Sequence, residues 1–349
     1  MKWNNTQEYL YGETNKFKFK NKIASFDLDN TLIVTKSGKT FPIDENDWKF
    51  RFNNIKTKLH ELKDSCIIII SNQAGISTKK EDPERWMKKI ENISKELKIE
   101  MCVFCSTGHN IYRKPYPSFF TKIFVHDIDF ENSFFCGDSA GRQYDYRDTD
   151  YKFALNCKLP FKTPELFFEN KTCVIPKIIY PNTKEIKNKK IKFVPNQKEM
   201  IIMVGYPASG KSYISKYIHE NFNYEIINQD ELKTKAKCIK MATKLLLINK
   251  SLIIDSTNPD KKSRKEWIDL AKKYNYNIRL IKITTSLELS KHNNLYRFLK
   301  NEQKIIPDIV YRIFTSKYEN PDISEGINEI ITMNQVGKPN DELYNMFFY

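Results

Sequence analysis

The sequence predicts an α/β protein made of two doubly wound domains, and three observations support this prediction. The chain is 349 residues long, which is enough for two domains that each have a core. Short apolar runs typical of strands buried on both faces recur in both halves, for example Ile67–Ile70 and Ile201–Val204. These runs end in glycines and polar residues, as parallel sheets do where they bind ligands. We place the domains at residues 1–180 and 198–349, with a connector at 181–197.

Composition favours a protein that acts on a polyanion in a reducing compartment. The net charge is +15, and residues 151–300 carry 30 Lys+Arg against 13 Asp+Glu. A generally lysine-rich composition is the alternative explanation of this charge. For the lysine-rich connector 181–197, a solvated linker is the first interpretation and contact with a phosphate backbone is the second. Seven cysteines without a regular array fit reducing conditions, and Cys102 and Cys105 are interpreted as core residues. Without a visible signal peptide or membrane-spanning run, we expect a soluble intracellular protein.

The first domain opens with a polar and aromatic segment, residues 1–22, which we expect at an edge of its fold. Ile23–Phe26 then forms a short strand that ends at Asp27 and Asp29. Alternation places both carboxylates on the same side at the strand's carboxyl end. Two such close carboxylates repel each other unless a cation lies between them, and Mg²⁺ is the usual cation. A lone D-x-D remains a weak signal, because Asp also caps turns.

Three later stretches strengthen the case for a phosphoryl site. The apolar run Ile67–Ile70 leads into Ser71, Asn72 and Gln73, whose hydroxyl and amides can hold phosphoryl oxygens. Lys114 follows another strand and supplies a fixed cation, and Asp138 lies at the tip of a further strand. In a parallel sheet these groups converge on one edge.

The D-x-D-x-T motif, Ser71, Lys114 and Gly137-Asp138 together resemble the haloacid-dehalogenase-type phosphatases. The resemblance implies that Asp27 is a nucleophile that becomes an aspartyl-phosphate, and that Asp29 is the general acid and base. It implies that Ser71 and Lys114 stabilise the transferring phosphoryl group. Mg²⁺ would be held by Asp27, Asp138 and the backbone carbonyl of Asp29.

The resemblance narrows at residues 36–41 and 150–165, which look like the phosphatase half of bifunctional polynucleotide kinase 3′-phosphatases. By this resemblance Asp150 is an acid beside the metal, whereas Asp145 and Asp148 are interpreted as solvated loop charges. Too few residues separate Thr31 from the next predicted helix for a capping domain. An uncapped site can admit the end of a polymer.

The second domain contains a phosphate-binding loop of the pattern G-x-x-x-x-G-K-[ST], directly after the strand Ile201–Val204. Gly205 and Gly210 allow positive φ and close backbone approach, so that successive N–H groups can hold phosphate oxygens. Lys211 would reach the β- and γ-phosphates of ATP, and Ser212 would bind Mg²⁺ through its hydroxyl. A chance Gly-Lys-Ser turn is the alternative, which the preceding strand and the amphipathic helix behind the loop disfavour.

Two acids follow later strands of this domain. Asp230 comes after the strand at 224–229 and could accept a proton from an attacking hydroxyl. Asp255 ends the next strand, where such folds place the acid that helps to position Mg²⁺. Helices that bear Arg264 and Arg297 come after it.

Residues from 205 to about 331 look like the kinase half of the same bifunctional enzymes, through the phosphate loop, residues 255–259 and His292-Asn293-Asn294. This resemblance implies that Asp230 is the base for a 5′-hydroxyl, that Arg264 contacts substrate or phosphate, and that Arg297 is a lid arginine. For Arg264 or Arg297 considered alone, a surface salt bridge explains the residue as well as a catalytic role does. Gln229 and Leu295 occupy positions where the family often has basic residues. We therefore expect weaker binding of the substrate and less help for Arg297. His292 is interpreted as a packing residue.

The resemblance covers residues 3–335 and implies an enzyme that uses Mg²⁺ and ATP to heal nucleic-acid ends in DNA strand-break repair. It would remove 3′-phosphates and phosphorylate 5′-hydroxyls. RNA end repair and a small-molecule phosphatase/kinase fusion remain alternatives, and a silent end-binding scaffold is disfavoured because the site residues are present. We expect a monomer that binds nucleic-acid ends, DNA preferred, without a membrane or an N-terminal phosphopeptide-reading module. The family suggests the nucleus, with the cytoplasm as the alternative, and leaves any repair ligase or scaffold partner unidentified.

Overall fold

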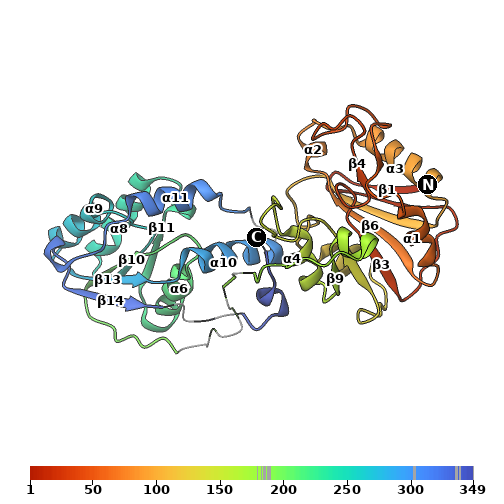
Figure 1. Ribbon diagram of the computed structural model, residues 1–349. Coiled ribbons are helices and arrows are strands. Elements are labelled where there is room, and N and C mark those ends of the chain that lie inside the picture. The colour runs from red at the N-terminus through yellow and green to blue at the C-terminus, as the bar shows by residue number, and fades with distance from the viewer. Residues whose placement is uncertain are drawn as a thin grey trace. The chain divides into compact units, whose positions relative to one another are not determined.

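The computed structural model of the protein describes residues 1–178, 180, 181, 183, 186, 190–301 (backbone only at 301), 304–334, 337 and 339–348. It divides into two compact units, Met1–Ile179 with Met346–Tyr349, and Tyr180–Asn345 (Figure 1). Residues 182, 184, 185 and 187–189 of the expected connector lie outside the described residues. No helix in the described ranges has the length and apolar character needed to cross a membrane.

A seven-stranded sheet forms the centre of the first unit, in the order β1-β2-β7-β6-β3-β8-β9. β2 pairs antiparallel with β1 and β7, and the other neighbours pair in parallel. The N-terminal segment therefore forms the sheet edge, as predicted. The strands are β1 (Lys2–Asn5), β2 (Tyr9–Glu13), β3 (Ile23–Phe26), β6 (Cys66–Asn72), β7 (Met101–Ser106), β8 (Phe134–Cys136) and β9 (Phe161–Lys162), beside a separate hairpin of β4 (Ile33–Val34) and β5 (Lys49–Phe50).

Helices cover both faces of this sheet, because the side chains of its strands alternate between two apolar cores. Ile67 and Ile69 share one core with the longest helix of the unit, and Ile68 and Ile70 share the other with the helix that follows β8. The first of these helices begins where the Asp82 side chain accepts a hydrogen bond from the Arg85 N–H, at 3.0 Å. The helices are α1 (Ile55–Glu61), α2 (Ala74–Ser77), α3 (Pro83–Leu97), the π-helix η1 (Phe119–Ile123), α4 (Thr149–Asn156) and α5 (Pro164–Glu169).

The second unit is built on a five-stranded, wholly parallel sheet in the order β11-β12-β10-β13-β14. Its core on one face includes side chains of α8 and α9, and its core on the other face includes those of α6. The elements are β10 (Glu199–Val204), α6 (Lys211–Phe222), β11 (Glu225–Asn228), α7 (Gln229–Leu232), α8 (Lys235–Leu247), β12 (Leu252–Asp255), α9 (Lys261–Lys273), β13 (Asn277–Ile283), α10 (Leu287–Asn301), α11 (Asp308–Lys317), η3 (Ile323–Glu325), β14 (Glu329–Met333) and η4 (Glu342–Asn345).

The strand order of the second unit determines where a ligand can bind. From β10 the chain goes through α6 to the outer strand β11, returns through β12, and then crosses to β13 on the other side of β10. The direction of the connections thus reverses at β10, and such a reversal leaves a crevice at the carboxyl end of the strand. The predicted fold class, two α/β units with parallel sheets, is confirmed.

Candidate active sites

The carboxyl end of β3 presents two carboxylates in different environments. Asp27 follows the strand directly, and its N–H donates to the Cys136 carbonyl at 2.8 Å, so that it extends the sheet by one residue. Its side chain is buried, whereas that of Asp29, two residues on, is exposed. One acid is therefore held inside the site and the other faces solvent at its rim.

Lys114 lies between two of the buried acids. Its Nζ donates to Asp27 Oδ1 at 2.7 Å and to Asp150 Oδ1 at 2.8 Å, and the residue is 2% exposed. The amide of Asn72 holds the Lys114 backbone on both sides: Asn72 Nδ2 donates to the Lys114 carbonyl at 3.1 Å, and Asn72 Oδ1 accepts from its N–H at 2.9 Å. The Asn72 amide thus positions the Lys114 backbone, and its expected role as a substrate ligand stays a prediction.

The exposed Asp29 is oriented by Gln73, a residue of the loop after β6 whose contact with Asp29, 44 residues away, the sequence did not indicate. Gln73 Nε2 donates to Asp29 Oδ2 at 2.7 Å and to the hydroxyl of the buried Ser71 at 2.9 Å. Gln73 therefore connects the expected general acid to the expected phosphoryl-binding hydroxyl. Its place directly after Ser71 and Asn72, in a loop at a strand end, was the signal that could have identified it.

Thr31, the last residue of the D-x-D-x-T motif, joins the two strands that carry the acids. Its hydroxyl lies 3.2 Å from Asp27 Oδ2 and 3.3 Å from Asp138 Oδ1, and accepts from the Asp138 N–H at 3.1 Å. Because one hydroxyl holds Asp138 by both backbone and side chain, Thr31 fixes the position of that acid relative to β3. The motif contained Thr31, but sequence alone did not indicate this bond.

Three carboxylates, from Asp27, Asp138 and Asp150, are close enough to share a cation. One oxygen of each lies within 4.8 Å of the others. Asp150 comes this close because Gly137 has no side chain: a Cβ there would lie 2.5 Å from Asp150 Oδ2. Three carboxylate oxygens are a donor set that suits Mg²⁺. The expected contribution of the Asp29 carbonyl stays a prediction.

Burial and repulsion between carboxylates raise the pKa values of Asp27 and Asp138. Burial raises the pKa of Asp27 well above its usual value, although the charge of Lys114 opposes the shift. Burial, followed by repulsion from Asp150, raises the pKa of Asp138 to about 7. Burial lowers the pKa of Lys114, but the charges of Asp150 and Asp27 outweigh it, so that this pKa is raised. The site thus holds more negative charge than its lysine neutralises, which favours a bound cation.

The phosphate loop of the second unit has the backbone that its sequence pattern predicts. Ala208 and Gly210 have φ of 57° and 102°, and a Cβ at Gly205 would lie 3.0 Å from the Ser209 hydroxyl and 3.2 Å from the Ile283 carbonyl. Lys211, the first residue of α6, is buried and donates to the carbonyls of Gly205 at 2.9 Å and Tyr206 at 2.6 Å. The Lys211 ammonium group thus lies against the loop in which it is expected to bind the phosphates of ATP.

Neighbouring elements support this loop from outside. Asn293 of α10 donates to the Ala208 carbonyl at 3.0 Å, and the Thr285 hydroxyl donates to the Ser209 carbonyl at 2.8 Å. Asn258 Nδ2 donates to the Met203 carbonyl, at the end of β10, at 2.8 Å. Asn258 and Asn293 stood in the motifs that carried the family resemblance, but the sequence did not show that they hold the loop backbone.

The charged residues expected around the loop lie within electrostatic reach of one another. Burial lowers the pKa of Lys211 to about 8; Asp255 and Asp230 oppose this shift, and Arg297 adds to it. Asp255 ends β12 and accepts a hydrogen bond from Asn228 Nδ2 at 3.3 Å. Burial raises the pKa of Asp255, and the Ser212 hydroxyl opposes this shift. The oxygens of Ser212 and Asp255 fit a Mg²⁺ ion at the mouth of the loop. Asp230 lies in α7 and is exposed.

Arg264 does not have the role that the sequence predicted. Its side chain is fully buried, and it donates from Nε and Nη2 to the two carboxylate oxygens of Glu325, at 2.8 and 2.7 Å. Nη1 donates to the Glu319 carbonyl at 3.1 Å. The expectation that Arg264 contacts substrate is therefore wrong, because protein groups occupy the guanidinium and no surface of it faces solvent.

The motif His292-Asn293-Asn294 holds three separate parts of the second unit together. The buried His292 contacts the Tyr344 carbonyl through Nε2 at 2.7 Å, and Asn294 exchanges two hydrogen bonds with the backbone of Ile306, at 2.9 and 3.1 Å. Together with the bond from Asn293 to the phosphate loop, these contacts make the motif structural. The interpretation of His292 as a packing residue agrees with this geometry.

Comparison with known proteins gives two family matches and several relatives. The family described as polynucleotide kinase 3 phosphatase matches residues 22–168, and an AAA domain family matches residues 200–321. A bifunctional polynucleotide phosphatase/kinase of Schizosaccharomyces pombe is 35% identical over 341 residues, which cover 95% of this chain and 84% of the relative. A polynucleotide 3′-phosphatase of Saccharomyces cerevisiae is 26% identical over 206 residues, which cover 42% of this chain and 87% of that protein.

Proposed function

The chain belongs to the family of bifunctional polynucleotide phosphatase/kinases, and we propose that it heals broken nucleic-acid ends by removing 3′-phosphates and phosphorylating 5′-hydroxyls. The products, a 3′-hydroxyl and a 5′-phosphate, are the ends that a ligase requires. The observation that best supports the proposal is Lys114 between Asp27 and Asp150, with Asp138 close enough to share a cation with both acids.

In the phosphatase reaction, Asp27 attacks the phosphorus of the terminal phosphate and forms an aspartyl-phosphate as the bond to the 3′-oxygen breaks. Asp29 gives its proton to the departing 3′-oxygen. It then takes a proton from the water that attacks the aspartyl-phosphate and releases inorganic phosphate. Lys114 and the Ser71 hydroxyl stabilise the charge on the transferring group. Mg²⁺, when held by Asp27, Asp138 and Asp150, offsets the charge of the carboxylates and of the substrate.

In the kinase reaction, the N–H groups of the phosphate loop and Lys211 hold the phosphates of ATP, while Asp230 accepts the proton of the attacking 5′-hydroxyl. The γ-phosphoryl group passes to the 5′-oxygen, and ADP leaves. Arg297 stabilises the charge on the transferring group. Ser212 and Asp255 would hold the Mg²⁺ that accompanies the nucleotide. Positioning and charge neutralisation supply most of the catalysis in such a transfer.

The substrate that we propose is a broken DNA strand, which a monomeric enzyme processes in the nucleus as the family resemblance suggests. The basic excess of residues 151–300 favours a polyanion over a small molecule. RNA ends share the same terminal groups, so matched DNA and RNA substrates decide between them. A ratio of DNA to RNA turnover below one would reject the DNA preference and leave the end-healing activity in place.

The deciding experiment incubates the protein with Mg²⁺, ATP and a nicked duplex that carries 3′-phosphate and 5′-hydroxyl ends, and resolves both ends separately. Asp27→Asn should lower 3′-phosphate release on the order of a thousandfold and leave 5′-phosphorylation intact, because it removes only the nucleophile. Lys211→Ala should do the reverse, and each variant serves as the control for the other. Intact phosphatase turnover in Asp27→Asn would disprove the aspartyl-phosphate assignment.

A further inference from the structure

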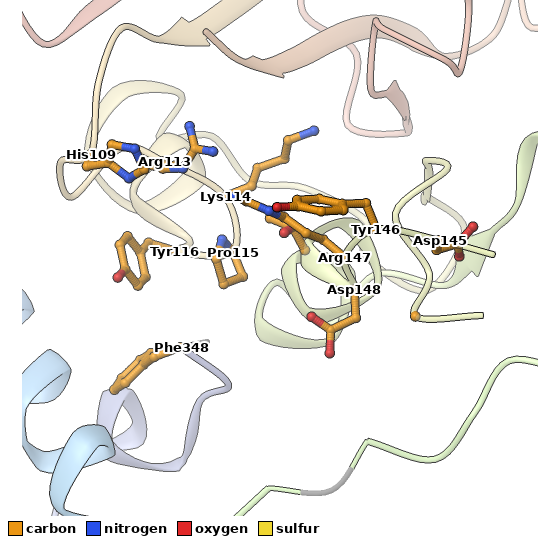
Figure 2. Close-up of a pocket in the computed structure, with 12 residues that line it drawn as sticks. His109, Arg113, Lys114, Pro115, Tyr116, Asp145, Tyr146, Arg147, Asp148 and Phe348 are labelled. Atoms are coloured by element: carbon orange, nitrogen blue, oxygen red, sulfur yellow. The ribbon is translucent and has the colours of Figure 1, made fainter. Parts of the chain in front are cut away.

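A cavity of about 580 Å³ adjoins the candidate phosphatase site of the first unit. Lys114 lies in its wall, and Figure 2 shows the residues that line it. One part of the lining comes from the loop after β7, which carries His109, Arg113 and Tyr116. Another part comes from residues 141–149, before and at the start of α4. The cavity therefore lies directly beside the lysine that would hold the terminal phosphate.

The acids that line the cavity are already neutralised. Asp145 pairs with Arg142, whose Nε lies 2.8 Å from Asp145 Oδ2, and it also accepts from the N–H groups of Ala140 and Arg142 at 3.1 and 3.0 Å. Asp148 pairs with Lys152 of α4 at 2.7 Å. In Figure 2, Asp145 lies on the opposite side of the cavity from His109 and Arg113. Neither acid is left to balance the cations of the cavity.

Two cations of the cavity, Arg113 and Arg147, form no ion pair among the residues that the structure describes, and they repel each other. Burial lowers the pKa of His109, and the positive charges of Arg113 and Arg147 lower it further. Burial, followed by the charge of Arg147, also lowers the pKa of Arg113. Arg113 is half-buried, and the like charge of Arg147 near it costs free energy that a bound anion would recover.

A second, independent observation points to a missing hydrogen-bond acceptor. Nη1 of Arg113 is buried and has no partner among the described residues. Buried polar atoms of native proteins nearly always have a partner, and an unpaired one calls for a ligand or another explanation. Arginine is also the residue best suited to hold a phosphate, since it presents several donors in one plane.

We propose that this cavity is a second phosphate subsite, in which Arg113, Arg147 and His109 bind the phosphodiester next to the terminal nucleotide of the strand. The proposal rests on the proposed 3′-phosphatase function, because the terminal phosphate then lies beside Lys114 and the next anion along the strand is that phosphodiester. Exposed rings flank the subsite: Tyr146, in its lining, is 91% exposed and Tyr144 is 72% exposed. Such rings are surfaces on which the bases of a single strand can stack.

The test compares two dinucleotides that carry a 3′-phosphate: one has an ordinary phosphodiester and the other a neutral methylphosphonate at the same linkage. With the unmodified enzyme, the methylphosphonate should lower kcat/KM for phosphate release by about ten- to hundredfold, because it removes the anion that the arginines hold. In Arg147→Gln, the ordinary dinucleotide should lose a similar factor, and the methylphosphonate should cause little further loss. Arg113→Gln should behave in the same way.

The matched control is Lys63→Ala, which also removes one positive charge from the first unit. Lys63 is exposed and precedes β6, at the end of the strand away from Ser71 and Lys114, so the full methylphosphonate effect should persist there. Equal turnover of both dinucleotides by the unmodified enzyme would overturn the subsite, and so would a full methylphosphonate effect in both arginine variants. Failure of the proposed function is a different result, namely 3′-phosphate release that survives Asp27→Asn.

Discussion

At the scale of single residues, burial is the main cause of the pKa shifts of Asp138 in the first unit and Lys211 in the second. It raises the pKa of Asp138 to about 7, with Asp150 adding to the shift, and it lowers the pKa of Lys211 to about 8. The acid is thus held near the point where it loses its proton at physiological pH, and the lysine is held closer to neutrality than a free lysine. In the first unit, a bound cation would offset the charge of the carboxylates. In the second unit, bound phosphates would offset the charge of Lys211.

Binding of Mg²⁺ to the first unit should therefore depend on pH. Below the pKa of Asp138, about 7, the ion must displace a proton from the carboxyl, so its apparent affinity should fall by about tenfold for each unit of pH. The raised pKa of Asp27 acts in the same direction. Above pH 7 the contribution of Asp138 to this dependence should level off, because Asp138 is then ionised.

Titration calorimetry with Mg²⁺ between pH 5.5 and 8, without nucleotide, measures this dependence. Asp138→Asn is the control: it should bind the ion weakly and with a smaller pH dependence, because it removes one titrating ligand. An affinity that stays constant from pH 5.5 to 7 in the unmodified protein would contradict the assignment of Asp138 to the ion.

At the scale of elements, long-range side-chain bonds hold the functional loops of the second unit. Asn293 of α10 holds the phosphate loop, and Arg264 of α9 holds Glu325 of η3 with two hydrogen bonds, at 2.8 and 2.7 Å. Arg264 also donates to the Pro259 carbonyl at 3.1 Å, in the loop that leads from Asp255 into α9. The buried ion pair therefore fixes the loop that follows one of the candidate metal ligands.

Loss of this ion pair should destabilise the second unit. Arg264→Met leaves the Glu325 carboxylate buried without its partner, so we expect a loss of about 3–5 kcal/mol in the free energy of unfolding. Replacing both residues, as Arg264→Met with Glu325→Gln, should recover part of this loss, because no unpaired charge then remains. Chemical denaturation followed by tryptophan fluorescence measures both variants, and an unchanged midpoint for Arg264→Met would refute the structural role.

At the scale of the whole molecule, the last residues of the chain belong to the first unit and not to the second, with which they are contiguous in sequence. Asn156 of α4 donates to the Phe347 carbonyl at 2.6 Å and accepts from its N–H at 2.7 Å. Phe348 is 2% exposed, and its ring packs edge-on against Tyr116, with 6.2 Å between centroids (Figure 2). Asn156 also donates to the Pro115 carbonyl at 2.9 Å, next to Lys114.

Phe348→Ala should consequently destabilise the first unit, although it lies far from that unit in sequence. Removing a buried phenylalanine side chain costs about 3–5 kcal/mol where the site cannot collapse. We expect a lower midpoint for the unfolding of the first unit in scanning calorimetry, with reduced phosphatase and unchanged kinase activity. Phe41→Ala is the matched control, because Phe41 is 78% exposed and its loss should change the free energy of unfolding by no more than about 0.5 kcal/mol. Equal midpoints for the two variants would contradict the docking of Phe348.

Local patterns in the sequence were sufficient for the fold class, and they indicated several of the residues that the structure brings together in the two candidate sites. The apolar runs of β3, β6, β10 and β12 predict buried parallel strands, and each is followed at once by the residues that bear its chemistry. Since the carboxyl ends of parallel strands lie on one edge of a sheet, strand position alone predicted that Asp27, Lys114 and Asp138 would meet. The phosphate loop was predictable for the same reason, because strand, glycines and lysine are adjacent in the chain.

Tertiary structure alone decided the partners of side chains that come from distant segments. Arg264 carries no sequence mark that separates a substrate contact from an ion pair with Glu325, 61 residues away. Asn72 binds the backbone of Lys114, 42 residues further along the chain. Asn156 binds the backbone of Phe347, 191 residues further along, and so holds the neighbouring Phe348 in the first unit. Periodicity and motif spacing indicate the structure of a single strand and of the loop that follows it. The pairing of remote side chains depends on the order of strands in the sheet and on how closely the backbones approach, and these quantities exist only in the folded chain.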